Sequence, residues 1–516
     1  MKPTGVFAIL ISLAAFAADD ASTWRTYGKN LAGWRYSELE EIRPENVARL
    51  APEWIFQTGV AGKNESTPLV FDRQMYVTSL SNHAFALDAR TGRPIWRYSR
   101  LVPERVNLCC GQVNRGFAVL GDTLFKVNIE ATLVALDRRT GTVLWETRIE
   151  DHKKGYSATV APLVVKDKVL IGIAGAEFGT RGFVDAYDAR SGARLWRFWT
   201  VPATGEPGNE TWSGDSWRRG GGSTWITGTF DPELNLVYWG TGNPGPDMYG
   251  DDRAGDNLYT CSLLALDADT GKLRWHYQFT PHDIHDWDST SDPVLVDFAA
   301  GGRHVKAVVM ANRNGFMYAL ERATGKLLYG KPYTKVTWAD RIGADGRPRL
   351  VAGRDPTEEG NHACPGLGGG HNWQATTYNP RTGLYYFTST EGCHLYYKTR
   401  QDYVEGQWYQ GSTVAPIPAE GRTGRILAVD PATGNVRWKF DLVTPPSSGL
   451  LSTAGGLLFG GDAEGYVFAL DARTGKVLWH FQTGGAVGSP PISYALDGRQ
   501  YIAVAAGSAI FTFRLK

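Results

Sequence analysis

The sequence predicts an all-β protein, an eight-bladed β-propeller of four-stranded blades, on the strength of a repeated motif, its spacing and the composition. Each copy is an apolar strand followed by Asp-x-x-Thr/Ser-Gly, with a tryptophan eight residues after the Asp. Most copies start about 41–54 residues apart, which is the length of one four-stranded blade. The 61 glycines supply the many tight turns that such a fold needs.

Each copy of the motif reads as two strands joined by a polar turn of Asp, Thr and Gly. We expect its aromatic residue to pack between blades, a structural role. The full motif begins at Asp88, Asp137, Asp188, Asp267, Asp430 and Asp471, with Trp96, Trp145, Trp196, Trp275, Trp438 and Trp479 as the aromatic residues, and a softened copy begins at Glu321 with Tyr329.

An eighth blade is expected in the long interval between Glu321 and Asp430, around residues 378–388. The N-terminal region is expected to supply one more blade edge, because the Trp-x-Phe-Gln-Thr-Gly pattern at Trp54 recurs at Trp479. A closed ring of blades would protect the strand edges that an open sheet exposes.

Residues 1–18 read as a signal peptide, and residues 19–516 as a single propeller domain. Lys2 precedes an apolar run over residues 6–16, which ends in small residues before Asp19. That run is too short to cross a bilayer, and no later stretch is long enough. The mature chain is therefore expected to be exported, into the periplasm or beyond it. A formal net charge of +1 gives no indication of a nucleic-acid partner.

Two cysteines, Cys109 and Cys110, are adjacent in the sequence. Neighbouring Cα atoms lie about 3.8 Å apart, whereas an ordinary disulfide spans about 4.4–6.8 Å. A bridge between them would close a small rigid ring with no loop-closure stabilisation, suited to covering a flat ligand. Two reduced or separately paired cysteines are the alternative. No Cys-x-x-Cys-His motif occurs, which excludes a covalently attached haem of that type.

Together, the repeat and the adjacent cysteines resemble the pyrroloquinoline quinone (PQQ) dependent alcohol dehydrogenases, a family that includes periplasmic methanol and ethanol dehydrogenases. The likeness covers nearly the whole mature chain, from Trp24 onward. It implies a Cys109–Cys110 disulfide over one face of PQQ and Trp225 against the other. It also implies a Cys364–Cys393 disulfide, which leaves Cys261 as a free thiol.

The resemblance implies further residues around PQQ, whose three carboxylates need cationic and hydroxyl partners when buried. Arg313 would contact the quinone oxygens. The expected polar partners of the cofactor are Glu65, Arg115 and Thr159, and Asn372 and Trp373 are additional pocket candidates.

A metal ion beside the quinone is implied as well, held by Glu177, Asn243 and Asp286, with Asp286 also acting as the catalytic general base. Asp288 resembles the additional acidic ligand of lanthanide-using members, although calcium-using relatives carry a similar Asp-x-Asp. Oxygen ligands of this kind suit Ca²⁺ or a lanthanide, and the identity of the metal stays open. The neighbouring His282, Asp283 and His285 are expected to make loop hydrogen bonds.

The implied activity is oxidation of an alcohol by metal-assisted hydride transfer to PQQ. Electrons would pass to an external acceptor, expected to be a cytochrome c. The substrate would be a primary alcohol, a polyol or a sugar, because residues 445–448 lack a tryptophan that relatives often place over the pocket. The alternative is a non-catalytic propeller that binds protein partners, since such scaffolds share the repeat.

Overall fold

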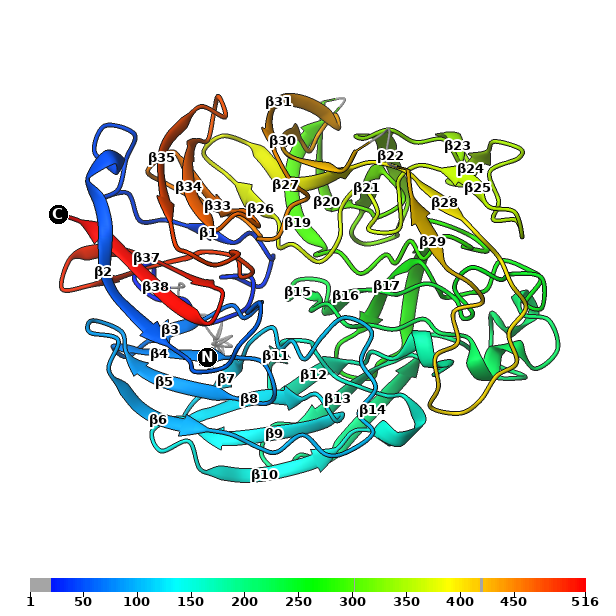
Figure 1. Cartoon of the computed structure of the whole chain (residues 1–516), viewed down its shortest axis with the longest axis horizontal. Coiled ribbons are helices and arrows are strands. Elements are labelled where there is room, and N and C mark those ends of the chain that lie inside the picture. Colours follow the sequence, from blue (N-terminus) through cyan, green and yellow to red (C-terminus); the bar gives the residue numbers. More distant parts are fainter. Residues whose placement is uncertain (1–19, 301, 418–420) are drawn as a thin grey trace, which may run out of the picture.

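The computed structural model describes residues 20–300, 302–417 and 421–516, so the predicted signal peptide lies outside the described residues. Within those ranges, eight sheets of four or five strands lie around a common centre (Figure 1). The helical segments of the described residues are five short 3-10 turns: η1 Val47–Arg49, η2 His152–Lys154, η3 Ala176–Phe178, η4 Asn209–Thr211 and η5 Ser216–Arg219. No helix in this described part of the chain has the length and apolar character needed to cross a membrane.

Sheets 1–5 are each built from four strands that follow one another along the chain. Their strands are β3 Leu69–Phe71, β4 Gln74–Thr78, β5 Ala84–Asp88 and β6 Pro94–Tyr98 in sheet 1; β7 Ala118–Leu120, β8 Thr123–Asn128, β9 Thr132–Asp137 and β10 Val143–Arg148 in sheet 2; β11 Leu163–Val165, β12 Lys168–Gly172, β13 Phe183–Asp188 and β14 Arg194–Trp199 in sheet 3; β15 Thr229–Asp231, β16 Leu236–Gly240, β17 Ser262–Asp267 and β18 Leu273–Gln278 in sheet 4; and β19 Val294–Ala300, β20 Arg303–Ala311, β21 Phe316–Glu321 and β22 Leu327–Pro332 in sheet 5.

Sheets 6–8 combine strands that are further apart in the sequence. They are β26 Thr377–Asn379, β27 Leu384–Glu391, β30 Thr423–Asp430 and β31 Asn435–Leu442 in sheet 6; β32 Leu451–Thr453, β33 Leu457–Gly461, β34 Tyr466–Asp471 and β35 Val477–Gln482 in sheet 7, with β1 Tyr36–Ser37 parallel to β32; and β36 Ile492–Leu496, β37 Arg499–Ala506, β38 Ala509–Leu515 and β2 Leu50–Gln57 in sheet 8.

The predicted extra blade around residues 378–388 is wrong. Strands β26 and β27 pair with β30 and β31, so these residues form the first half of the sheet that carries the Asp430 motif. The long interval arises because two small sheets interrupt this region: β23 Ala339–Ile342 with β24 Pro348–Leu350, and β25 Asn361–Ala363 with β28 His394–Tyr396 and β29 Val414–Pro416. The eighth sheet is formed instead by the C-terminal strands β36–β38 and the N-terminal strand β2. The expectation that the Trp54 region supplies a sheet edge is thereby confirmed.

The turn motif explains why tryptophan recurs at a fixed position. In the first copy, Asp88 Oδ1 accepts hydrogen bonds from the backbone N–H and the hydroxyl of Thr91, which closes the turn. Gly92 follows at a φ of +72°, and a Cβ at this glycine would lie 2.5 Å from the Trp54 ring. The turn can therefore form only where a residue without a side chain lets the indole of the preceding sheet lie against it.

The same contact links successive sheets through the repeated aromatic residues, which confirms their structural role. The indole N–H groups donate to backbone carbonyls of the next sheet in the pairs Trp54–Ala89, Trp96–Arg138, Trp145–Ala189, Trp275–Arg322, Trp438–Ala472 and Trp479–Leu50. Tyr329 replaces the indole with its hydroxyl, which donates to the Pro431 carbonyl at 2.8 Å. Trp196 makes the contact through its ring, which lies against Gly271.

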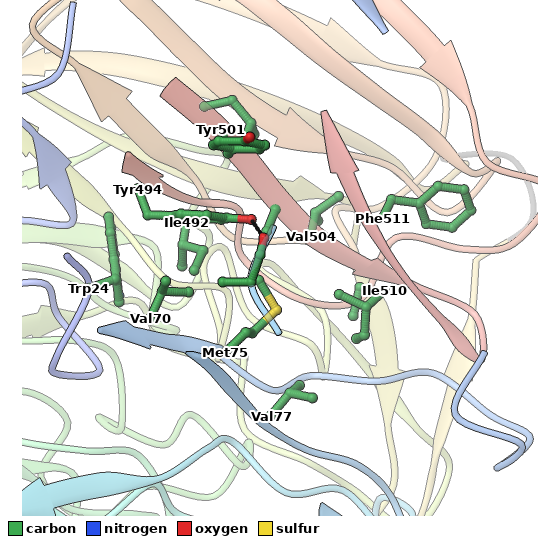
Figure 2. Packing of buried hydrophobic residues seen from close by; sticks show 14 of the residues in the cluster. Trp24, Val70, Met75, Val77, Ile492, Tyr494, Tyr501, Val504, Ile510 and Phe511 are labelled. Atoms are coloured by element: carbon green, nitrogen blue, oxygen red, sulfur yellow. Dashed lines mark hydrogen bonds between the residues drawn. The ribbon is translucent and has the colours of Figure 1, made fainter. Parts of the chain in front are cut away.

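The first and last sheets share one hydrophobic core. Figure 2 shows Met75 and Val77 of β4 facing Ile492, Val504 and Ile510 of sheet 8, and all five side chains are buried. Burial of this apolar area stabilises the junction between the two ends of the chain at roughly 25 cal/mol per Å². The core therefore holds the N- and C-terminal regions together beside the loops of sheet 1.

Candidate active site

A cavity of about 580 Å³ collects loops from several sheets. Twelve of the residues singled out in the sequence line it: Glu65, Cys109, Cys110, Arg115, Thr159, Glu177, Trp225, Asp286, Asp288, Arg313, Asn372 and Trp373. Asn243 does not line the cavity but is buried next to it, because its backbone N–H donates to Asp288 Oδ1 at 2.7 Å. The loops thus converge on one site although their residues span more than half of the sequence.

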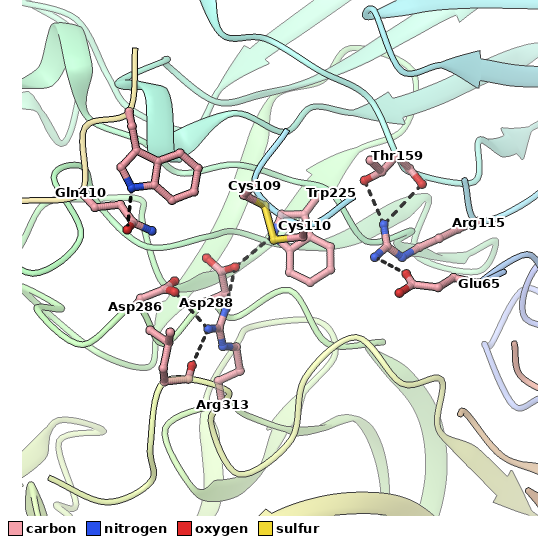
Figure 3. Close-up of a disulfide and its surroundings, with 12 residues drawn as sticks. Glu65, Cys109, Cys110, Arg115, Thr159, Trp225, Asp286, Asp288, Arg313 and Gln410 are labelled. Carbon is pink, nitrogen blue, oxygen red and sulfur yellow. Dashed lines mark hydrogen bonds and ion pairs between the residues drawn. A yellow bond between two sulfur atoms is a disulfide. The ribbon is translucent and has the colours of Figure 1, made fainter. Parts of the chain in front are cut away.

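Both predicted disulfides are present, and Cys261 is a buried free thiol, as expected. Figure 3 shows the Cys109–Cys110 bridge close to Trp225 in the cavity. A carboxylate oxygen of Glu177 lies within 4.8 Å of both sulfur atoms of this bridge. The adjacent-cysteine ring therefore forms part of the cavity wall and lies next to an acidic group.

One end of the cavity, which we call the paired end, is organised by Arg115. Its guanidinium donates to Glu65 Oε2 at 2.8 Å and to the Thr159 hydroxyl at 2.8 Å (Figure 3). The guanidinium carbon also lies 4.9 Å from the centre of the Trp225 ring, within cation–π range. These contacts fix the Arg115 fork, the type of group that binds a carboxylate through two hydrogen bonds.

Lys63 also belongs to this paired end and was not predicted from the sequence. Its ammonium group lies 3.2 Å from Glu65 Oε1 and 4.1 Å from the centre of the Trp373 ring. The available signal was its position two residues before Glu65. A lone lysine in a loop is usually solvated, however, and only the fold brings Trp373 to it.

At the other end, which we call the acidic end, Asp288 accepts three hydrogen bonds. Its Oδ1 accepts from the Asn243 backbone N–H, and its Oδ2 accepts from Trp225 Nε1 at 2.9 Å and from Arg313 Nη1 at 2.8 Å. Asp288 therefore orients the Trp225 indole and the Arg313 guanidinium, in addition to the metal role expected of it (Figure 3).

Asp286 also faces Arg313, with Asp286 Oδ2 lying 3.3 Å from Arg313 Nη2. Its backbone has a φ of +60°, a conformation that non-glycine residues rarely adopt and that is found preferentially at functional sites. Burial raises the pKa of Asp286 well above its usual range, and the nearby Arg313 opposes this shift. The carboxyl is thus poised to hold a proton unless further positive charge lies close to it.

Glu177 sits in η3, a single turn with glycine on both sides. Burial raises the pKa of Glu177 to about 7, and the negative charge of Asp288 adds to the shift. Glu177 is half-buried, and a carboxylate that has lost part of its hydration without gaining an ion-pair partner favours its neutral form. A metal ion would supply that partner, so this carboxyl fits a cation site.

Asp247 is a second residue of this region that was not predicted from the sequence. It is fully buried, and its Oδ1 accepts a hydrogen bond from Asn243 Nδ2 at 2.8 Å. Burial raises its pKa well above the usual range, with Glu177 and Asp288 as further negative neighbours. The signal was an acidic residue four positions after Asn243 in a glycine- and proline-rich loop. Spacing could not show that its side chain turns inward.

The remaining candidates occupy the cavity edge or the supporting loops. Asn372 donates from Nδ2 to the Gly368 carbonyl at 3.0 Å. The expected loop hydrogen bonds of the histidine-rich segment are confirmed: His282 bonds the Gly255 carbonyl, His285 bonds the Arg354 carbonyl, and Asp283 Oδ2 accepts from the Trp287 N–H. His394 and Arg422 also line the cavity and were not predicted.

Two family profiles match parts of this chain. A family profile described as Glucose/ethanol/alcohol dehydrogenase, beta-propeller domain, matches residues 24–345. A second profile, described as Outer membrane protein assembly factor BamB, matches residues 422–514.

Several named proteins match this chain over most of its length. Quinoprotein alcohol dehydrogenase PedH of Pseudomonas putida is 38% identical over 510 residues, covering 93% of this chain and 85% of that protein. A lanthanide-dependent methanol dehydrogenase of Methylacidiphilum fumariolicum is 37% identical, with coverage of 94% and 84%. Among solved structures, a europium-containing methanol dehydrogenase superposes with a TM-score of 0.92 at 34% identity, covering 96% of this chain and 98% of that one. This chain therefore belongs to the PQQ-dependent, or quinoprotein, alcohol dehydrogenase family.

Proposed function

We propose that this protein is an enzyme that oxidises an alcohol with PQQ as the hydride acceptor, and that Asp286 is the general base. The observation that carries the proposal is a single cavity in which the Cys109–Cys110 bridge, Trp225, Arg313 and Asp286 meet. A non-catalytic scaffold would have no need for buried carboxylates and a rigid aromatic wall at one point.

The residues present fit PQQ. Trp225 and the disulfide supply flat, rigid walls for a conjugated tricycle, while Arg115 and Thr159 supply donors for its carboxylates. A cavity of about 580 Å³ is within the usual size of a cofactor and substrate pocket. When bound, PQQ supplies the two-electron acceptor that the amino acids of this chain lack.

Asp286 would accept the hydroxyl proton of the alcohol. A carboxyl can act in this way only when it is ionised, and burial disfavours that form here. Arg313 at 3.3 Å favours the charged form, and a metal ion held beside Asp286 would favour it further. A bound metal ion and the Arg313 guanidinium would thus both favour the ionised form of Asp286.

Oxygen donors from Glu177, Asn243, Asp286 and Asp288 would hold the metal ion. All four come from loops of neighbouring sheets, and their hard oxygens suit Ca²⁺ or a lanthanide. Such an ion would act as a Lewis acid and orient the alcohol oxygen toward Asp286.

The reduced enzyme would pass its electrons to a separate cytochrome c. The whole sequence has no Cys-x-x-Cys-His motif, which is the reason for expecting an external acceptor. Export to the periplasm, with removal of residues 1–18, is supported by the two disulfides, which form in oxidising compartments.

We infer further that the eight sheets are the blades of one closed eight-bladed propeller, a single domain over residues 19–516. Two observations support closure. Strand β2 pairs with β38, joining the two ends of the chain in sheet 8, and the aromatic contacts continue from Trp479 to Leu50 and from Trp54 to Ala89.

A dye-linked assay of the purified mature chain would test the proposed function. The protein would be loaded with PQQ and with either Ca²⁺ or La³⁺, and then offered primary alcohols, polyols and sugars. We expect dye reduction that needs both PQQ and the metal. Absence of alcohol-dependent dye reduction in PQQ-loaded, metal-loaded protein across the panel would contradict the proposal.

A further inference from the structure

A fourth carboxylate, Asp247, is buried behind the acidic groups of the cavity wall, next to Asn243, and forms no ion pair in the described part of the chain. Its Oδ1 accepts from Asn243 Nδ2, while its Oδ2 is buried and has no hydrogen-bond partner. The nearby Arg253 does not satisfy it, because that guanidinium donates to the carbonyls of Pro246 and Asp283 and to the Asn257 side chain. A buried carboxylate oxygen without a partner is costly.

The charges around Asp247 do not balance. Five carboxyl groups interact electrostatically in this region, and two guanidinium groups face them. When ionised, the five negative charges exceed the two positive charges by three. The carboxyl groups are Glu177, Asp247, Asp283, Asp286 and Asp288, and the guanidinium groups are Arg253 and Arg313.

Asp247 also fixes the orientation of Asn243. Both amide hydrogens of Asn243 are engaged, one with Asp247 Oδ1 at 2.8 Å and one with the Pro244 carbonyl at 3.2 Å. An amide whose donors are both engaged presents its oxygen to whatever lies on the other side. Asn243 is therefore held as an oxygen donor, and the group that holds it is a carboxyl that can supply a further negative charge beside a bound cation.

We propose that Asp247 is a further acidic member of the cation site, which positions the Asn243 oxygen and biases the site toward a trivalent ion. The proposal rests on the proposed function, because it assumes that a metal ion binds at Glu177 and Asn243. A trivalent ion would neutralise the excess of three charges, whereas a dication would leave one buried negative charge uncompensated.

The bias follows from Coulomb's law. Each negative charge near the ion stabilises a trivalent ion half as much again as a divalent ion at the same distance. Loss of one buried carboxylate therefore weakens La³⁺ binding more than Ca²⁺ binding. A loss of Asn243 orientation alone would weaken the binding of both ions without this difference.

The test compares metal affinities of the PQQ-loaded full chain by equilibrium dialysis, with bound La³⁺ or Ca²⁺ measured by mass spectrometry. Asp247→Asn keeps the acceptor oxygen for Asn243 but removes the charge. We expect the ratio of La³⁺ to Ca²⁺ affinity to fall about tenfold, and to be restored toward the original value in Asp247→Glu. Asp292→Asn is the matched control: Asp292 is buried and has an unpartnered Oδ1, but its charged neighbours are Arg35 and Arg115 rather than the carboxyl groups of the acidic end, so the ratio should not change.

Thermal melting without metal provides a second measurement. Because Asp247→Asn replaces a buried carboxyl that lacks an ion-pair partner in the described residues with a neutral amide, the variant should melt no lower than the original chain when metal is absent. An affinity ratio that stays within about twofold of the original in Asp247→Asn overturns the proposal. If the unaltered chain binds both ions but oxidises no alcohol, the proposed function fails while the dialysis ratio still decides the role of Asp247. If it binds neither ion, both fail.

Discussion

The two ends of the cavity differ in how their charges are matched. At the paired end, Glu65 meets both Lys63 and Arg115, so positive charge is in excess. At the acidic end, Arg313 is shared between Asp286 and Asp288, while Glu177 and Asp247 have no ion pair in the described residues. This difference supports the proposal that the anionic carboxylates of a cofactor bind at the paired end and that a cation binds at the acidic end.

Asp286→Asn should cause the largest change, because it removes the proposed base at the acidic end while keeping the size and shape of the side chain. We expect turnover to fall by about 10²–10⁴-fold with either metal. PQQ binding, followed by its absorbance, should persist because the paired end is untouched. If Asp286→Asn retains more than a tenth of the turnover, Asp286 does not act as the base.

Arg115→Ala should remove the ion pair and the hydrogen bond that organise the paired end. It leaves Glu65 with the half-exposed Lys63 as its remaining ion-pair partner in the described chain, and loss of one member of a buried pair costs about 3–5 kcal/mol. We expect a lower melting temperature and weaker PQQ binding in a titration followed by absorbance. Metal affinity should change little. Arg115→Lys is the control, since it keeps the charge but not the two-pronged hydrogen bonding.

The two disulfides should contribute differently, one to the stability of the fold and the other to the cavity. Cys364–Cys393 closes a loop of 29 residues, which is worth about 3–4 kcal/mol in the chain-entropy model. Cys109–Cys110 closes almost no loop and lies in the cavity wall. Replacing each pair by serines should therefore destabilise the first variant to denaturant, and weaken PQQ binding mainly in the second. Equal losses of unfolding free energy in both variants would contradict this division.

The Asp288→Ala variant tests whether Asp288 is a metal ligand in addition to its hydrogen-bonding role. We expect lanthanide-supported turnover to fall about 100-fold, and calcium-supported turnover to fall less. Because Asp288 also accepts from Trp225 and Arg313, some loss of PQQ binding should accompany the change. Asp288→Asn retains one carbonyl oxygen and isolates the effect of charge. Full lanthanide-supported turnover in both variants would show that Asp288 is not a ligand.

Much of the fold could be predicted because the blade motif is local. Asp88, Thr91 and Gly92 form their turn within five residues, so each copy identifies a sheet wherever it occurs. Spacing could not distinguish a blade from an excursion, which is why residues 378–388 were assigned to an additional blade. The pairing of β2 with β38 joins residues that are more than 450 positions apart, and only the echo of Trp54 pointed to it.

The residues of the site also fall into two groups: those that a local motif identifies, and those whose role depends on partners from other loops. Residues in recognisable motifs, such as Cys109–Cys110 and Trp225, could be found from the sequence because the motif itself carries the chemistry. Lys63 and Asp247 could not, because their importance depends on partners brought by other loops. A single acidic residue in a glycine- and proline-rich loop is usually exposed, and its burial is a property of the assembled sheets.

A final prediction concerns pH, and its effect should be the smallest. The pKa of Glu177 is about 7 in the folded, metal-free chain, against 4.5 ordinarily, so the folded state binds more protons than the unfolded state between these values. Stability should therefore fall as pH rises through this window, by about 2 kcal/mol once partial solvent exposure is allowed for. Melting temperatures measured from pH 5 to pH 8 with a chelator should show this decline. Added La³⁺ should oppose it most at high pH, because metal binding displaces the proton. Glu177→Gln should flatten the metal-free profile, and an unchanged slope in that variant would assign the effect to other groups of the acidic end.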